Sequence, residues 1–404
     1  MRKRRYNLFS WVLYDFANSP YSTIMTTLIF PVFFTESIAP GKWGLTAWAL
    51  LYGGCEVLSA VFSPPLGAMS DMMNRRKRFL VFFTLLAVAG TALTRTLSGG
   101  EVFRAVFFFS IAQLGFSLAN VFYNSMLAEV SPPERRETVS GIGWGAGYFG
   151  GMLFMIAVLL LADMGSPTFQ KDSFLLTALW YLAFSIPVFF FFEGSQNSGV
   201  SVSFKAGYSE VIGTIKKMSG RKPLFYFLLA SFFFNDGVNS AILFGGIFLR
   251  KGYGFDDASL FKAFIAFNLI AAAGAWIIGP LADRLSSRRA LFLMMWAWIL
   301  SLSLLPFLSG KAALMTIASV VGILIGGTQS VLRGYLSKLA PAGSQGEWFG
   351  FYTLMGKAAA LFGPLLFGIF YGLIQDIKLS ALSLIPLFLL AGYFLRKVET
   401  KLGS

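Results

Sequence analysis

The pattern Asp-x-x-Asn-Ser occurs twice in the chain, beginning at Asp15 and at Asp236, each time within a long apolar run. Residues three positions apart share a helix face, so Asn18 accompanies Asp15 and Asn239 accompanies Asp236. A charged side chain inside a membrane-spanning run costs at least ~2.5 kcal/mol on insertion scales and usually faces a polar cavity. The pattern therefore predicts two surfaces that could bind a polar molecule. The alternative is a structural knot in which Asp and Asn join helix ends.

Further polar side chains interrupt other apolar runs. Arg333 follows Gln329 by four residues, which places both side chains on one helix face. The Arg333 guanidinium could hold a carboxylate or a phosphate through two hydrogen bonds. It could equally pair with Asp15 or Asp236, or extend to the membrane surface. An earlier run carries donors and acceptors that suit a zwitterion, namely Asn120, Tyr123 and Asn124.

Two single charges lie deep in other apolar runs. Glu56 is near the centre of the run 43–69, and Lys357 is about nine residues into the run 348–373. Burial favours the protonated form of a carboxylate that has no fixed partner, so Glu56 is our leading candidate for coupling to a proton. A static ion pair between Glu56 and Lys357 is the alternative interpretation.

A third set of charges lies just after two of the runs and repeats at one spacing. Gly67, Asp71 and the basic group from Arg75 onward recur as Gly279, Asp283 and the basic group around Arg288. Such a carboxylate can accept hydrogen bonds from a guanidinium and from the N–H groups at the start of a facing helix. We predict a latch that breaks when two halves of the molecule move apart; the alternative is a solvated, topology-setting cluster. Its members are Asp71, Arg75, Arg76, Asp283, Arg284 and Arg288.

The composition defines the class of protein that must position these residues. Of the 404 residues, 56% are hydrophobic and only 13% are charged, about half the charged fraction of a soluble domain. The chain is therefore predicted to be an all-α integral membrane protein, since its runs are too long for the strands of an outer-membrane barrel. The net charge of +14 falls in short clusters between runs, which argues against a nucleic-acid partner. With one Cys and no His, we expect no metal site and no cofactor.

The apolar runs predict twelve spans in two sets of six. Positions 1–193 form a first six-helix bundle, 194–222 a cytoplasmic linker with a short surface helix, and 223–404 a second bundle. The excess of Lys and Arg in alternate loops predicts that both termini are cytoplasmic. The spans are 9–35, 43–69, 79–97, 102–127, 139–163, 174–193, 223–249, 257–281, 290–308, 311–337, 348–373 and 379–396.

The paired loop pattern resembles the signature of the major facilitator superfamily. Within it, SWVLYDFANS at 10–19, FYN at 122–124, SPPER at 131–135 and NDGV at 235–238 are similar to the vacuole-effluxer-like family of autophagy-related proteins. The resemblance implies twelve helices, alternating access, a cavity lined by spans one, four, seven and ten, and contact between spans two and eleven. Eukaryotic members of that family are associated with amino-acid efflux from the vacuole. The chain departs from the loop signature at Met72 and Asn74, which usually are Arg and Gly.

These observations predict a secondary active transporter that exports or exchanges a small polar metabolite such as an amino acid, coupled to a proton or another ion. A flippase or exporter of a lipid-like amphiphile, or a non-transporting membrane sensor, is the alternative. An enzyme is disfavoured because no polar catalytic loop is present. The chain lacks a nucleotide-binding loop, so ATP hydrolysis is not expected. We expect a monomer in the lipid bilayer, in a bacterial inner membrane.

Overall fold

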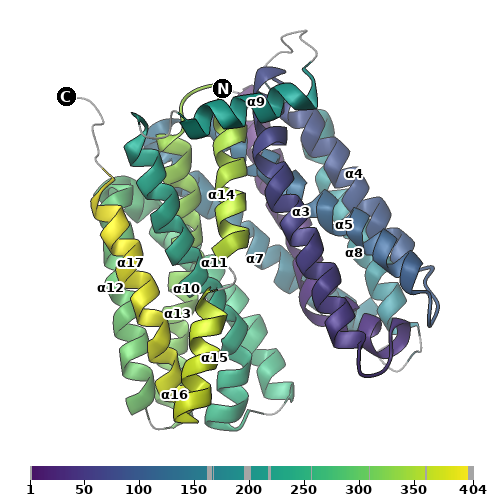
Figure 1. The fold of residues 1–404 in the computed structure, drawn as a ribbon, viewed down its shortest axis with the longest axis vertical. Helices are drawn as coiled ribbons and strands as arrows, with labels where there is room; N and C mark the ends of the chain where they lie inside the picture. Colours follow the sequence, from purple (N-terminus) through teal and green to yellow (C-terminus); the bar gives the residue numbers. More distant parts are fainter. Residues whose placement is uncertain are drawn as a thin grey trace. The chain divides into compact units, whose positions relative to one another are not determined.

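The computed structural model describes residues 2–161, 166, 168–194, 202–216, 220–255, 257–308, 310–359 and 362–398. Within these ranges the chain is helical and contains no strand (Figure 1). Eleven helices in the described part of the chain are long and apolar enough to cross a membrane, and they correspond to the second to twelfth predicted spans. The chain is therefore an all-α, multi-pass membrane protein, as predicted.

The first predicted span is also helical but is divided into four segments. Pro20 and Pro31 cannot donate backbone hydrogen bonds, so a regular α-helix does not continue through this stretch. Two segments are π-helices, in which the N–H group bonds to the carbonyl five residues earlier, as Ile29 does to Ile24. The segments are α1 (Arg2–Tyr21), η1 (Ser22–Leu28), α2 (Phe30–Phe33) and η2 (Phe34–Ile38).

The chain divides into two compact units, and the first comprises residues 1–130, 146–208 and 343–350. In this unit α1 packs on α8, α4 packs on both α5 and α8, and α3 packs on α5. The core includes Tyr14, whose hydroxyl hydrogen-bonds to the Thr84 and Tyr181 hydroxyls at 2.7 and 2.8 Å. The remaining helices wholly within this unit are α3 (Gly44–Met72), α4 (Arg76–Thr94), α5 (Val102–Ser125), α6 (Leu127–Val130) and α8 (Phe169–Phe191).

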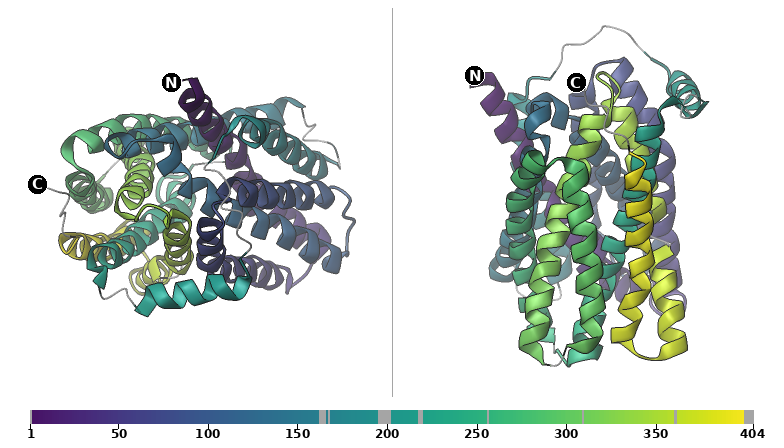
Figure 2. Two further views of the ribbon diagram at one scale, coloured as in Figure 1. Left: turned by 90° about the horizontal axis from the view of Figure 1, so that it is seen from above. Right: turned by 90° about the vertical axis from the view of Figure 1, so that its left-hand side faces the viewer.

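The second unit comprises residues 131–145, 209–342 and 351–404. In this unit α11 packs on α13, α10 packs on α17, and α12 packs on α13 and α17. The right-hand view of Figure 2 shows its green and yellow helices side by side. Its helices are η3 (Pro133–Arg135), α10 (Lys222–Tyr253), α11 (Asp257–Leu285), α12 (Ser287–Leu304), η5 (Leu305–Phe307), α13 (Lys311–Leu339), α15 (Phe362–Ile374), α16 (Ile377–Ser380), η6 (Ala381–Leu384) and α17 (Ile385–Arg396).

Three helices contribute residues to both units: α7 (Arg136–Leu161), α9 (Phe204–Lys216) and α14 (Gln345–Ala359). The first turns of α7 belong to the second unit, and the first turns of α14 belong to the first unit. The division into compact units therefore places the starts of α7 and α14 in a different unit from the rest of each helix. The predicted bundles 1–193 and 223–404 stay a prediction. The predicted linker contains α9, while its positions 195–201 and 217–219 lie outside the described residues.

Glycines set the close approach of α4 and α5. A Cβ atom at Gly90 would lie 2.6 Å from the Ala112 nitrogen, and one at Gly115 would lie 2.5 Å from the Ala87 nitrogen. Both obstacles are backbone atoms, which cannot rotate away. Small residues that allow such backbone contact are characteristic of helix pairs in membranes.

We predict that Gly115→Ala lowers the free energy of unfolding by about 1–3 kcal/mol, since it overpacks the α4–α5 contact. The matched control is Gly53→Ala in α3, where a Cβ atom meets nothing within 4 Å and where alanine has the higher helix propensity. The measurement is denaturant unfolding of each purified variant in detergent. Equal stability of the two variants would contradict the packing argument.

Candidate functional site

Asp71, in the last turn of α3, lies against the first turn of α14 within the first unit. Its carboxylate accepts hydrogen bonds from the N–H groups of Gly346 and Glu347, at 3.0 and 2.9 Å. The first N–H groups of a helix have no partner within the helix and carry partial positive charge, so a carboxylate is well placed there. The Arg76 guanidinium is 2.7 Å from Asp71 and 3.1 Å from Glu129. We call these residues the first latch.

The contact at the first latch requires two helices to approach without side chains. A Cβ atom at Gly67 of α3 would overlap the Gly346 carbonyl group. One turn further along α14, a Cβ atom at Gly350 would lie 2.5 Å from the Ser63 carbonyl oxygen and 2.6 Å from the Pro64 Cα. The start of α14 therefore lies directly on the backbone of α3, which brings its N–H groups within reach of Asp71.

Asp283, in the last turn of α11, forms the equivalent second latch within the second unit. Its carboxylate accepts from the backbone N–H and the hydroxyl of Thr138, at 2.8 and 2.6 Å, in the first turn of α7. The Lys338 ammonium is 2.9 Å from Asp283 and also forms an ion pair with Glu137. Glu137 is fully buried and accepts a hydrogen bond from the Ser287 hydroxyl. Two carboxylates thus share one cation here.

The structure places three of the predicted latch residues away from the carboxylates at their own loops. Arg288 stands at the repeat position of Arg76, yet it donates to the Arg396 carbonyl at 2.7 Å. Arg284 is exposed, and Arg75 occupies the N-cap position of α4. The cation of the second latch is instead Lys338, which comes from α13.

The departure of the first loop from the family signature leaves its turn intact. Asn74 stands where the signature has glycine, and its φ of 51° is in the left-handed region that Asn tolerates better than most residues. Ser286 holds the matching position of the second loop with a φ of 82°. Met72, the other departure, is exposed. Both loops therefore turn at the same repeat position without glycine.

The acid of the first Asp-x-x-Asn-Ser pattern is buried in the first unit. Asp15 is 6% exposed and accepts a hydrogen bond from the Tyr123 hydroxyl at 2.8 Å, so α1 and α5 bring two predicted binding residues together. Gly147 allows α7 to approach, since a Cβ atom there would lie 2.6 Å from the Ser19 hydroxyl oxygen. The Asn18 side-chain nitrogen is buried, and no group among the described residues accepts its hydrogen bonds.

The acid of the second pattern has a different kind of partner. Both carboxylate oxygens of Asp236 lie 2.9 Å from the Gly363 nitrogen, in the first turn of α15. Asp236 therefore holds the start of α15 against α10, which is the structural role that the sequence left open for this pair. Asn239, three residues on, is half-buried.

Glu56 lies in a polar chain inside the first unit. The Tyr21 hydroxyl donates to the Gln113 carbonyl oxygen at 3.1 Å, and the Gln113 amide donates to the Glu56 carboxylate at 2.9 Å. The Ser117 hydroxyl lies 3.5 Å from the same carboxylate oxygen. Lys357 belongs to the second unit, and its pairing with Glu56 stays a prediction.

Arg333 is 2% exposed and contacts the start of α7 within the second unit. It donates to the Ser140 hydroxyl at 2.8 Å and to the Ser140 carbonyl at 2.6 Å, and its guanidinium lies 5.1 Å from the centre of the Trp144 ring. The other predicted binding residues, Asn120, Asn124 and Gln329, are half-buried on α5 and α13.

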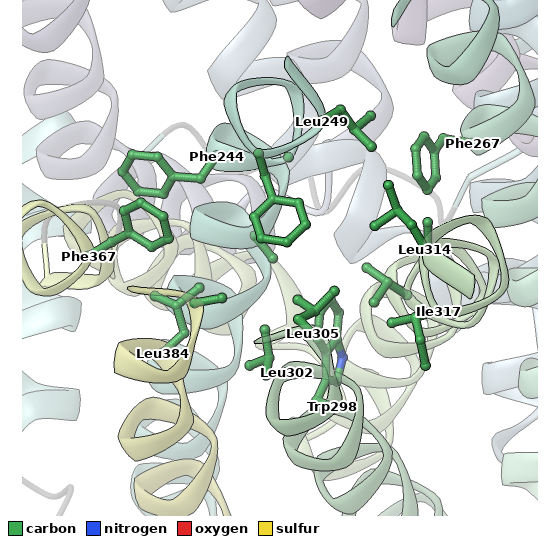
Figure 3. Close-up of a pocket in the computed structure, with 16 residues that line it drawn as sticks. Phe244, Leu249, Phe267, Trp298, Leu302, Leu305, Leu314, Ile317, Phe367 and Leu384 are labelled. Atoms are coloured by element: carbon green, nitrogen blue, oxygen red, sulfur yellow. The ribbon is translucent and has the colours of Figure 1, made fainter. Parts of the chain in front are cut away.

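The second unit also contains an apolar cavity of about 100 Å³ (Figure 3). Carbon atoms of Phe, Leu, Ile, Val, Ala and Trp side chains form its wall, and Phe244 stacks on Phe367 at 3.9 Å between ring centres. None of the predicted binding residues lines it. Ligand pockets usually measure about 300–1,000 Å³, so this cavity alone does not fit a polar metabolite. The described residues contain no cluster of three or more Cys, Asp and Glu side chains that could hold a metal.

An aspartate at the end of α3 binds the start of α14, and an aspartate at the end of α11 binds the start of α7, in a chain of membrane-spanning helices. These features are characteristic of the major facilitator class. The fold is similar to that of the human organic anion transporter MFSD10 (TETRAN), with a TM-score of 0.71 and 17% identity over 97% of this chain and 99% of that one.

Sequence comparison defines the family. The profile described as "Vacuole effluxer Atg22 like" matches residues 38–131 and 128–403. The chain is 32% identical to the uncharacterized MFS-type transporter YxiO of Bacillus subtilis, over 94% of this chain and 92% of that protein. It is 21% identical to autophagy-related protein 22 of Eremothecium gossypii, over 93% of this chain and 87% of that protein. The chain belongs to the Atg22-like vacuole effluxer family, a family of major facilitator transporters, as its motifs predicted.

Reasoning from the sequence missed four residues of these clusters: Glu129, Glu137, Thr138 and Lys338. The sequence did contain a signal for two of them. The spacing of 209 residues that relates Pro132 to Pro341 also relates Glu129 to Lys338, so both charged residues occupy repeated positions. The loop pattern drew attention to charges near each aspartate in the chain, whereas these partners come from other helices.

We predict that Lys338→Met destabilises the protein by about 3–5 kcal/mol, because it leaves two buried carboxylates without their cation. Adding Glu137→Gln should recover part of that loss, since one of the two charges is then absent. The matched control is Arg284→Met, which removes an exposed cation from the last turn of α11 and should change stability by less than about 0.5 kcal/mol. Unfolding free energies in detergent test this, and equal losses in the single and double variants would contradict it.

Proposed function

We propose that this chain is a secondary active transporter that works by alternating access and exports or exchanges a small polar metabolite such as an amino acid. The two latches are the observation that carries the proposal. Each one joins the end of a helix from one predicted bundle, α3 or α11, to the start of a helix from the other, α14 or α7. Every bond in a latch is a hydrogen bond or an ion pair between polar groups, so it can break and re-form.

The substrate class rests on the chemistry of the buried polar groups and on family membership. A zwitterion requires an anion to meet its ammonium group and a cation to meet its carboxylate. The first unit offers a buried anion, Asp15 with Tyr123, and the second unit offers a buried cation, Arg333. The family profile is named for an effluxer, which favours export as the direction.

Ligand-induced stabilisation tests the substrate class. We predict that at least one compound from a panel of the twenty amino acids raises the melting temperature of the purified protein. A ligand at 100 times its Kd should stabilise it by about 2.7 kcal/mol. The shift should disappear in Asp15→Asn and Arg333→Lys, which alter the buried anion and cation.

The control for that panel is Asp172→Asn, which removes an exposed acid paired with Arg95 at 3.2 Å. This variant should keep the full shift. A shift that persists in both buried variants would place the binding site elsewhere. Stabilisation by long-chain amphiphiles but by no amino acid would support the alternative function.

We propose that Glu56 couples transport to a proton. Its carboxylate accepts from the Gln113 amide, which in turn accepts from Tyr21, so protonation of Glu56 rearranges the hydrogen bonds of this chain. That rearrangement extends from α3 through α5 to the end of α1, where the Asp-x-x-Asn-Ser residues lie.

We predict that Glu56→Gln abolishes accumulation of the stabilising amino acid against its gradient in proteoliposomes with an imposed pH difference. Exchange of labelled for unlabelled amino acid should continue, because glutamine keeps the shape of the side chain and lacks only the titratable proton. Glu210→Gln, an exposed acid on α9, is the control and should retain both activities. Accumulation that persists in Glu56→Gln would assign coupling to another group or another ion.

A flippase or exporter of a lipid-like amphiphile is the second candidate, and the apolar cavity of the second unit favours it. Its wall of aromatic and aliphatic side chains suits the end of a hydrocarbon chain (Figure 3). We further propose that the protein acts as a monomer in a bacterial inner membrane. The distribution of Lys and Arg supports the proposal that both termini are cytoplasmic.

A further inference from the structure

A groove of about 1,000 Å³ lies between α12 and α17, entirely within the second unit. Its polar end is lined by Ser286, Arg288, Arg289 and Arg396, and its apolar part by Phe292, Met295, Trp296, Leu389, Gly392 and Tyr393. The two helices touch at the base of the groove, where a Cβ atom at Gly392 would overlap the Met295 sulfur. Figure 1 shows α17 running alongside α12.

The groove is strongly basic at one end. Arg289 and Arg396 are exposed, and no acid among the described residues forms an ion pair with either of them or with Arg288. Arg288 uses its guanidinium to donate to the Arg396 backbone carbonyl, which holds this cation at the last residue of α17. The same end is the N-terminus of α12, where the Ser286 side chain makes no capping hydrogen bond. Three arginines and the first turn of α12 therefore line one end of the groove, and the Glu137 carboxylate that accepts from the Ser287 hydroxyl in that turn is not part of the lining.

The other end of the groove is apolar and faces outward. Trp296 and Tyr393 are 58% and 52% exposed, respectively, which is unusual for large aromatic side chains unless lipid covers them. Trp296 follows Arg289 by seven residues, which is about 10 Å along a helix. A lipid bound along this length would have its headgroup at Arg289 and its acyl chain, within the hydrocarbon layer, at Trp296.

The first unit provides an internal comparison. There Lys77 of α4 donates to the Phe192 carbonyl after α8 at 2.6 Å, just as Arg288 of α12 donates to the last residue of α17. The chain after α8 continues with the acidic Glu193, whereas α17 ends with the basic pair Arg396 and Lys397. The two contacts are alike in kind but one position apart in the repeat, because Arg288 repeats Arg76 and Lys77 is repeated by Arg289. An acid follows the contact in the first unit, whereas a second cation follows it in the second unit.

We infer that the α12–α17 groove binds an anionic glycerophospholipid of the cytoplasmic leaflet. The phosphodiester would lie among Arg288, Arg289 and Arg396, and one acyl chain would lie along Trp296 and Leu389. Basic grooves between membrane helices on the cytoplasmic side suit such headgroups. The exposed aromatic wall is what selects a lipid over a free phosphate.

The test is native mass spectrometry and thermal unfolding of the full chain in neutral detergent, with added palmitoyl-oleoyl phosphatidylglycerol or phosphatidylcholine. We expect phosphatidylglycerol to bind and to raise the melting temperature, and phosphatidylcholine to do neither. The double variant Arg289→Gln/Arg396→Gln should bind phosphatidylglycerol about twenty-fivefold more weakly, since each surface cation contributes about a fivefold effect. High salt should reduce binding to the wild type.

Two controls keep the result decisive. Arg78→Gln removes an exposed cation from α4 of the first unit and should leave lipid binding unchanged. Glycerol 3-phosphate tests the headgroup alone and should give no stabilisation, because it lacks the chain that contacts Trp296. Equal effects of the two lipids, unchanged binding by the double variant, or full stabilisation by glycerol 3-phosphate would each overturn the inference.

Discussion

The constraint on which this structure depends is that a helix start buried in a membrane protein must satisfy N–H groups that have no partner in their own helix. Three aspartates of this chain meet that need. Asp71 binds the start of α14, Asp283 the start of α7 and Asp236 the start of α15. Asp236 lies inside an apolar run, and Asp71 and Asp283 lie just after one. The burial of each carboxylate is offset by helix dipoles that point at it. These acids therefore lie beside the starts of other helices and not beside their middles.

The duplication of the chain explains the positions of these acids but not their partners. Asp15 and Asp236 occupy repeated positions, yet one accepts from a tyrosine hydroxyl and the other from a backbone N–H. Arg76 and Arg288 are also a repeated pair, yet only Arg76 reaches its aspartate. Each half has kept the backbone turn and changed the side chains that meet it. The two halves therefore differ in the polar groups that they carry at repeated positions.

Most of the fold could be predicted because apolar runs, turn residues and repeated spacing are properties of single segments. The eleven confirmed spans and the family follow from these. The polar clusters were harder, because their geometry depends on residues from separate helices. The cation at Asp283 is Lys338 and not the predicted Arg288, and Glu56 accepts a hydrogen bond from Gln113. Both pairings depend on how separate helices pack, which no local sequence pattern predicts. The break of the first span was also absent from the prediction, although Pro20 and Pro31 were visible in the sequence.

The break in the first span changes which of its side chains share a helix face. A π turn holds one more residue than an α turn, and each residue of an α-helix turns the chain by about 100°. Side chains before and after η1 therefore do not point in the directions that a continuous α-helix would give them. The face that contains Asp15 and Asn18 cannot be extended by counting through Ser22–Leu28 to the phenylalanines of α2. A chain shortened by one residue within η1 would bring the two faces back into register.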